Sequence, residues 1–175
     1  FKEEIIPNVA NKFLFVLAPA LFIITAIVAG VLIPWAPGLK AGSHWYVLQV
    51  TDVNVGVLFL LGVTSVGVYG IMIGGWASNN KYSLLGALRA SAQMISYELA
   101  MGIALIALII SSGGSLSFSE IVAGQNEGVA NIVWQPLGFI IFFICALAET
   151  NRAPFDLAEC ETELVGGYHT EYSSF

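Results

Sequence analysis

Charged residues are scarce in this chain: they make up 10 % of its 175 residues, against about 25 % in an ordinary soluble domain. Long polar stretches that could fold as a separate soluble domain are also lacking. Hydrophobic residues instead make up 57 % of the chain, and the mean hydropathy is +0.82. The composition therefore predicts one membrane-embedded unit over residues 1–175 rather than several domains.

Metal-binding and nucleotide-binding motifs are missing. The two cysteines, Cys145 in an apolar run and Cys160 in an acidic stretch, match no zinc or iron–sulfur ligand set in number or spacing. The chain also has no GxGxxG motif, no P-loop and no nucleophile with an evident base. We therefore predict no metal site, no cofactor bound by this chain and no nucleotide chemistry on it.

Basic residues are also few. There are 6, against 12 acidic residues, and the formal net charge is −6. This balance argues against nucleic-acid binding, because a surface that binds phosphates needs clustered Lys and Arg.

A starting methionine and a basic leader with a cleavage site are missing too. The chain begins with Phe1 and stops at Phe175, directly after a polar loop. We therefore expect it to be an internal fragment of a longer protein.

What the chain does contain is a series of apolar segments, at about 13–33, 53–73, 94–110 and 132–148. The first two carry no charge and are long enough, at about 1.5 Å per residue, to cross roughly 30 Å of hydrocarbon. The other two are near the lower limit of about 17 residues, and the third helix is expected to start near residue 84, with Ser83 as its N-cap. Glycines in the second segment favour close helix packing. The predicted fold class is all-α: a polytopic transmembrane bundle of four helices, followed by a folded acidic loop over 149–175.

The basic residues indicate the orientation of this bundle. Of the six basic residues, only Lys40 lies in the loops at 34–52 and 111–136. The other five lie before the first span, between the second and third spans, or after the fourth, which is the opposite side of the membrane. By the positive-inside rule that side is the cytoplasm, or the matrix of a mitochondrion. The acidic loop is then expected to face inward, and the loops at 34–52 and 111–136 are expected to face outward.

Glu98 lies about one turn inside the third apolar segment, where an ionised side chain costs a few kcal/mol. Such a residue is a functional candidate. The alternative is a carboxylate that reaches the inner interface and pairs with Arg89 or with another subunit. The neighbouring polar residues would suit a hydrated track and favour the functional interpretation: they are Ser91, Gln93, Ser96 and Tyr97.

The stretch from 149 to 172 contains half of the 12 acidic residues. Arg152 is expected to pair with Glu149 or Asp156, and Pro154 argues against one uninterrupted helix. "DLAECETEL" is compatible with a short helix capped by Asp156, on which Glu159 and Glu163 share one face. Glu161 points elsewhere on such a helix.

Repulsion between these carboxylates, together with partial burial, would raise the pKa of at least one of them and suit it to proton relay. A solvated acidic loop is the alternative interpretation. Apolar residues interleaved with the acids favour a loop that folds against a surface: Phe155, Leu157, Leu164, Val165, Tyr168 and Tyr172.

At these residues the chain resembles a known family. "ALAETNRAPFDLAECETELVGGYHTEYSS" closely resembles the loop after the fifth membrane helix of the H subunit of respiratory complex I, called subunit 1 in mitochondria. "FKEE", "DVNVGVLFLLGVTSVGVYGIMIGGWASNNKYSLLGALRASAQMISYE" and "PLGFIIFFICALAE" match further family blocks in the same order. The resemblance extends over nearly the whole chain.

The resemblance implies a subunit of about eight membrane helices, of which this chain would hold the second to the fifth. It also implies a proton-pumping NADH:quinone oxidoreductase, in which this subunit joins the hydrophilic arm to the membrane arm. The subunit would form part of the quinone chamber and couple quinone reduction to proton translocation. Flavin and iron–sulfur clusters would belong to partner subunits, and the membrane would be the bacterial or the mitochondrial inner membrane.

The same resemblance implies roles for individual residues. The implied quinone-chamber residues are Arg152 and Phe155, and Arg152 is also the implied charge partner of the acids. The implied coupling residues are the carboxylates Glu98, Glu149, Asp156, Glu159, Glu161, Glu163 and Glu171.

Two alternatives remain open at this stage. One is a homologous subunit of a membrane-bound hydrogenase, a formate hydrogenlyase or a photosynthetic NDH-type complex, although "NRAPFD" favours the respiratory branch. The other is a stand-alone transporter or channel, which an intramembrane Glu98 and glycine-rich helices would serve equally well.

Overall fold

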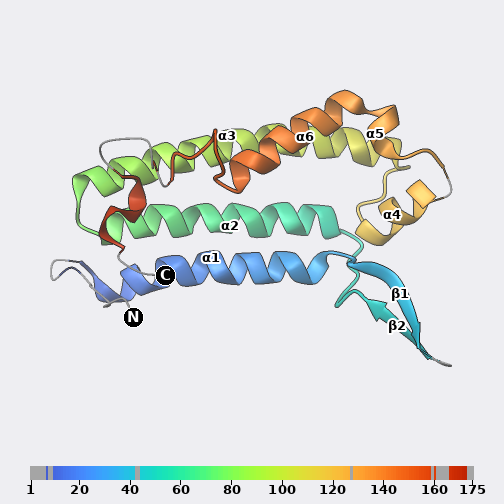
Figure 1. Ribbon diagram of the computed structural model, residues 1–175, viewed down its shortest axis with the longest axis horizontal. Coiled ribbons are helices and arrows are strands. Elements are labelled where there is room, and N and C mark those ends of the chain that lie inside the picture. The colour runs from blue at the N-terminus through green and yellow to red at the C-terminus, as the bar shows by residue number, and fades with distance from the viewer. Residues whose placement is uncertain are drawn as a thin grey trace.

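The computed structural model is helical, with one small hairpin (Figure 1). It describes residues 7, 10–41, 44–126, 128–158, 160 and 166–172, with only the backbone of 37–41, 45–48 and 126. The predicted all-α membrane helix bundle is confirmed. The elements are α1 (Lys12–Leu32), β1 (Ala36–Ala41), β2 (His44–Leu48), α2 (Gly56–Ala77), α3 (Lys81–Ser111), α4 (Phe118–Asn126), α5 (Asn131–Trp134), α6 (Pro136–Glu149) and the 3₁₀ helix η1 (Tyr168–Glu171).

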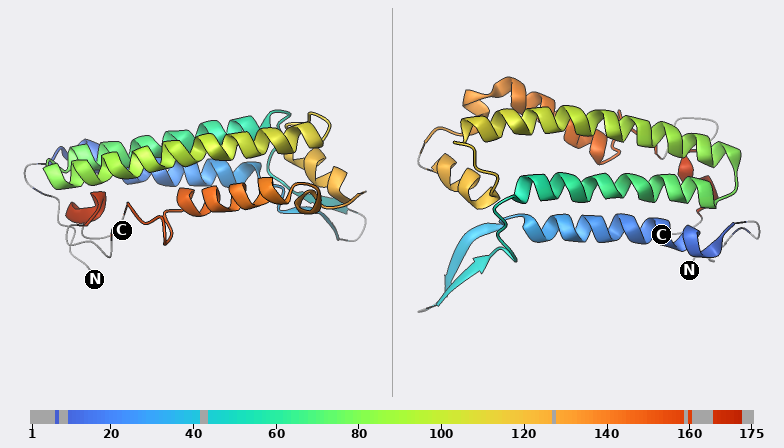
Figure 2. Two further views of the ribbon diagram at one scale, coloured as in Figure 1. Left: turned by 90° about the horizontal axis from the view of Figure 1, so that it is seen from above. Right: turned by 180° about the vertical axis from the view of Figure 1, so that it is seen from behind.

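The long helices form a layer with α2 in the middle, between α1 and α3 (Figure 1). In the described part of the chain, three helices are long and apolar enough to cross a membrane: α1, α2 and α3. The shorter apolar helix α6 packs against α3 on one face of this layer. Figure 2 shows that the described chain after α6 continues in the direction of α6 along the same face. This face therefore carries the acidic segment toward the N-terminal end of α3.

Glycines allow the helices of the layer to approach closely. A Cβ atom on Gly70 of α2 would lie 3.0 Å from the Ala18 carbonyl oxygen of α1. A Cβ atom on Gly75 would lie 2.3 Å from the Ala87 Cβ of α3, closer than two carbon atoms can pack. The close packing expected for the glycines of the second segment is thus confirmed at both interfaces of α2.

α3 begins earlier than the sequence predicted. Its N-cap is Asn80, whose side-chain oxygen accepts a hydrogen bond from the Tyr82 backbone N–H at 2.9 Å. The prediction of Ser83 as the cap is wrong, because Ser83 lies inside the helix and its hydroxyl donates to the Tyr168 carbonyl oxygen at 2.9 Å. With 31 residues, α3 is roughly 46 Å long, which exceeds the hydrocarbon thickness.

The fourth apolar segment is divided between two helices. α5 ends at Trp134, and α6 begins with Pro136 in its first turn. Proline lacks the backbone N–H and disfavours a helical conformation in the residue before it, here Gln135. The 14 residues of α6 are only about 21 Å long, so α6 is shorter than the predicted span.

The connections also differ in part from the predictions. The loop at 34–52 contains the antiparallel hairpin β1–β2, in which Ala36 pairs with Leu48 and Ala41 with His44. The short helix predicted after Asp156 lies partly outside the described residues. Its described part, 156–158 and 160, is a turn in which the Cys160 N–H donates to the Asp156 carbonyl oxygen at 3.1 Å. Cys160 has a φ of 51°, which ends a right-handed turn.

Candidate functional site

Glu98 is a partly buried residue on α3 that faces α2. Its Oε1 is hydrogen-bonded to the hydroxyl of Ser65 on α2. The same hydroxyl lies 2.8 Å from the carbonyl oxygen of Leu61, one turn earlier in α2. A serine hydroxyl carries one proton, so it cannot donate fully to both oxygens at once. Ser65 can therefore donate to an ionised Glu98, or accept from a protonated Glu98 while donating to Leu61.

Glu149 is the last residue of α6 and is also partly buried. α6 packs against α3, and the charge of Glu98 acts unfavourably on a charge at Glu149. The structure thus brings together two of the predicted coupling carboxylates from separate helices. Two carboxylates from separate helices in one partly buried region repel each other.

The segment after α6 is fixed to the same part of α3. The Phe155 carbonyl oxygen accepts a hydrogen bond from the Gln93 side-chain amide at 3.0 Å. The Phe155 ring meets the ring of Tyr97 edge to face, with centroids 5.0 Å apart. Ala158 is buried in the apolar cluster that includes Met94 of α3. Phe155 therefore packs on α3 at Gln93 and Tyr97, as a loop folded against a surface would.

The polar residues before Glu98 differ in their partners within the protein. Gln93 and Tyr97 hold Phe155, and the exposed Ser96 donates to the Ala92 carbonyl oxygen at 2.8 Å. The Ser91 hydroxyl is buried and has no hydrogen-bond partner among the described residues.

The structure describes the other predicted residues of the acidic segment only in part. Arg152 is exposed, and in the described part of the chain no ion pair joins it to Glu149. Asp156 is partly buried at the start of the turn that ends at Cys160. Three predicted coupling residues lie outside the described residues: Glu159, Glu161 and Glu163.

Glu171 lies at the N-terminal end of α3, away from the Glu98–Glu149 pair. Its Oε1 accepts a hydrogen bond from the side-chain amide of Asn80, the N-cap of α3, at 2.8 Å. Eighteen residues of helix separate Asn80 from Glu98, which corresponds to about 27 Å. The structure therefore gives Glu171 a contact at the turn between α2 and α3.

Tyr172 fixes the chain after η1 to α1. Its ring stacks on Phe15 with centroids 4.0 Å apart, and its hydroxyl donates to the Phe15 carbonyl oxygen at 3.0 Å. Burial, together with the neighbouring Tyr168, raises the pKa of Tyr172 to about 12. The phenol is therefore protonated near neutral pH and available as a donor.

A cavity of about 310 Å³ lies between α1, α2 and the chain after α6. Its size falls in the range of about 300–1,000 Å³ that is typical of small-molecule sites, and apolar and aromatic side chains form most of its wall. Arg152 and Phe155, the predicted quinone contacts, are not among its lining residues. Its lining side chains include Phe22, Ile71, Thr150, Asn151, Tyr168 and Tyr172.

The sequence did not predict that residues at the end of α6 and in η1 would line a common cavity. Thr150 and Asn151 follow Glu149 directly, so two cavity residues are adjacent to a predicted coupling residue. The available signal was the aromatic residues Tyr168 and Tyr172, which the sequence placed against a surface without indicating which one. Within the described residues, no group of three His, Cys, Asp or Glu side chains could hold a metal ion.

The chain is similar in sequence to proteins of one known family. The family model described as NADH dehydrogenase matches residues 1–175. The chain is 61 % identical over 173 residues to the H 1 subunit of NADH-quinone oxidoreductase from Cytophaga hutchinsonii, covering 99 % of this chain and 50 % of that protein. It is 56 % identical over 174 residues to the H subunit of the same enzyme from Flavobacterium johnsoniae, covering 99 % of this chain and 49 % of that one.

A third relative, NADH-quinone oxidoreductase subunit 8 of Rhodothermus marinus, is 52 % identical over 177 residues, with coverage of 99 % of this chain and 49 % of that protein. The chain thus spans about half the length of these curated relatives. The similarity to these subunits and the long apolar helices together identify an integral membrane protein.

Proposed function

We propose, on the premise that this chain belongs to the NADH dehydrogenase family, that it is part of a membrane-arm subunit of a proton-translocating NADH:quinone oxidoreductase. In this proposal, it forms one wall of the quinone chamber and couples quinone reduction to proton transfer through Glu98 and Glu149. The observation that carries the proposal is the hydrogen bond of Glu98, inside the apolar helix α3, to Ser65 of α2.

The Ser65 hydroxyl allows Glu98 to change protonation state without losing its hydrogen bond. When Glu98 is ionised, Ser65 donates to it; when Glu98 is protonated, Glu98 donates and Ser65 turns to the Leu61 carbonyl oxygen. A carboxyl group that is satisfied in both states is suited to take up and release a proton repeatedly. Glu98 and Glu149 repel each other when both are charged, which links the two carboxyl groups.

The cavity beside η1 supports a quinone site next to this pair. Its wall has the apolar and aromatic character that a planar quinone ring requires, with a few polar groups to orient it. Thr150 and Asn151 line the cavity and follow Glu149 directly. A change of charge on a bound quinone would act on Glu149, the residue before Thr150, and through Glu149 on Glu98.

In the proposed complex, other subunits hold the redox cofactors. Flavin and iron–sulfur clusters would lie in partner subunits of the hydrophilic arm, and other membrane-arm subunits would continue the proton path. The acidic segment would lie on the cytoplasmic or matrix side, where the basic residues Lys12, Lys81, Arg89 and Arg152 also occur.

Assembly is tested with a native gel of mildly solubilised source membranes, stained for NADH-dependent dye reduction and probed for this chain. We expect the chain in the same large band as the NADH activity. A large band without NADH activity would favour a hydrogenase-like relative, and a small band would favour a stand-alone transporter.

Coupling is tested with Glu98→Gln in the assembled complex. This variant keeps the side-chain size but cannot ionise, so quinone reduction and proton uptake should both fall while NADH oxidation by a water-soluble acceptor is retained. Glu120→Gln is the matched control, because Glu120 is an exposed residue of α4. Undiminished proton uptake in Glu98→Gln would contradict the proposed role of Glu98.

A further inference from the structure

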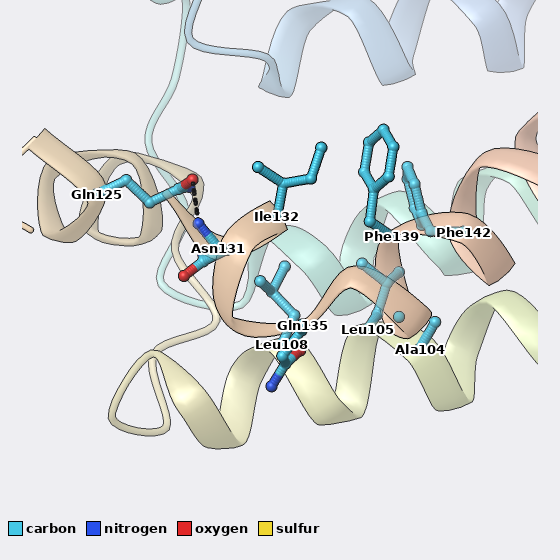
Figure 3. Close-up of a pocket in the computed structure, with 10 residues that line it drawn as sticks. Ala104, Leu105, Leu108, Gln125, Asn131, Ile132, Gln135, Phe139 and Phe142 are labelled. Atoms are coloured by element: carbon cyan, nitrogen blue, oxygen red, sulfur yellow. Dashed lines mark hydrogen bonds between the residues drawn. The ribbon is translucent and has the colours of Figure 1, made fainter. Parts of the chain in front are cut away.

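A second cavity, of about 400 Å³, lies at the other end of the bundle from the acidic segment, between α3, α4 and the α5–α6 break (Figure 3). Leu105 and Leu108 of α3 form one side, and Phe139 and Phe142 of α6 form the other. The break at Pro136 displaces α5 from the line of α6, as Figure 1 shows. This cavity is separate from the carboxylate pair and from the proposed quinone site.

Three carboxamide side chains supply the polar groups of this cavity, and no charged residue lines it among the described residues. Gln135 donates to the Ala107 carbonyl oxygen at 3.0 Å, and the Gln125 oxygen accepts from the Asn131 backbone N–H at 3.3 Å. The side-chain nitrogen of Asn131 is buried and has no partner among the described residues. A buried donor without a partner is costly, so an acceptor oxygen at this position would be favourable.

The cavity is continuous with the apolar surface of the bundle. Ile132 and Phe139 line it and yet are 47 % and 45 % exposed. Because the chain is an integral membrane protein, an opening of this kind gives access to amphiphiles of the bilayer. The absence of a lining charge among the described residues argues against an ionic head group inside the cavity and favours a neutral acceptor oxygen.

We propose that this cavity binds a phospholipid, with one acyl chain between α3 and α6 and an ester carbonyl oxygen that accepts a hydrogen bond from the Asn131 side-chain amide. The χ2 angle of asparagine has a broad range of low-energy values. A small rotation about this bond turns the Asn131 side-chain nitrogen from its buried position toward the ligand. The apolar wall supplies the contact area, and the amide fixes the depth of the chain.

The test uses the full-length protein in its assembled complex, reconstituted in nanodiscs that contain a phosphatidylcholine with a diazirine near the ester end of one acyl chain. After photolysis, we expect lipid adducts on peptides that contain residues 104–108 and 131–142. Asn131→Leu should retain about three- to tenfold less lipid, because it removes one hydrogen bond at similar side-chain volume. Ala104→Phe, which fills the cavity, should abolish the adducts.

Ile103→Phe is the matched control, because it introduces the same ring one residue away on an exposed side of α3, where Ile103 is 63 % exposed and does not line the cavity. Native gels verify that each variant assembles. Adducts that survive in Ile103→Phe but not in Ala104→Phe would support the proposal. Three results would overturn the proposal. The first is an equal yield of adducts in both variants, and the second is no adducts in the unmodified protein because another protein segment fills the cavity. The third is displacement of the lipid by a short-chain quinone.

Discussion

Ser65 of α2 and Glu98 of α3 are joined by a hydrogen bond between two neighbouring apolar helices. This bond places the carboxyl group in the interface of the bundle, where an ionised side chain costs more than it does in water. The serine hydroxyl has a second acceptor at Leu61, so it can serve either protonation state of Glu98. The proposed proton transfer depends on this arrangement and on Glu149 of α6.

Ser65→Ala should lower quinone reduction by about ten- to a hundredfold, because a hydrogen bond to a charged group contributes about 1.5–3 kcal/mol. Ser65→Thr keeps the hydroxyl and should retain most of the activity. The measurement is quinone reduction by the assembled complex, normalised to NADH oxidation by a water-soluble acceptor. Equal activity in the two variants would show that the hydroxyl is not required.

Gly75→Ala should destabilise the contact between α2 and α3 by about 1–3 kcal/mol, because its new Cβ atom would overlap Ala87. Gly62→Ala is the matched control in the same helix, since a Cβ atom there meets no atom within 4 Å. Thermal inactivation of the solubilised complex should shift to lower temperature for Gly75→Ala alone. A similar shift in both variants would argue against a packing effect at Gly75.

Phe155→Ala should release the segment after α6, because it removes the contact of the Phe155 ring with Tyr97. Limited digestion with trypsin should then cleave faster after Arg152, which is exposed and directly precedes Ala153. Phe143→Ala serves as the control, because Phe143 is an exposed residue of α6 that stacks only on Phe139 among the described residues. If the two variants were cleaved at the same rate, Phe155 would not be the anchor of the segment.

The attachment of Tyr172 to α1 should weaken at high pH. Burial raises the pKa of Tyr172 from 10.0 to about 12, so the folded state favours the protonated phenol. The resulting stability is fully present below about pH 10 and is lost as the pH rises through about 12. Tyrosinate absorbance should show a late titration step that Tyr172→Phe removes. A spectrum with no difference between the two proteins would contradict this assignment.

The sequence predicted the helical bundle because long apolar runs have few other ways to satisfy the backbone in a membrane. It also singled out Glu98, since a charged residue stands out in such a run. It did not predict the partner: Ser65 looks like any small polar residue of a glycine-rich helix, and only the register between α2 and α3 brings it to Glu98.

The local errors have physical causes. Asn80 and Ser83 are both good N-caps, and sequence pattern did not distinguish them; the structure uses Asn80 for the cap and Ser83 for the contact with Tyr168. The cavity residues Thr150 and Asn151 could not be identified, because the path of the chain after α6 depends on tertiary contacts such as that of Phe155. The predicted roles of Arg152 and Asp156 stay predictions.

The central claim is that Glu98 and Glu149 act as one coupled pair, and the most direct test is proton uptake by Glu98→Gln, Glu149→Gln and the double variant. The measurement is NADH-driven acidification of inverted membrane vesicles at matched content of the assembled complex. The account predicts a loss in each single variant and a double variant that is hardly worse than either, because one shared function is lost once. Full proton uptake in the single variants, or losses that simply multiply in the double variant, would contradict it.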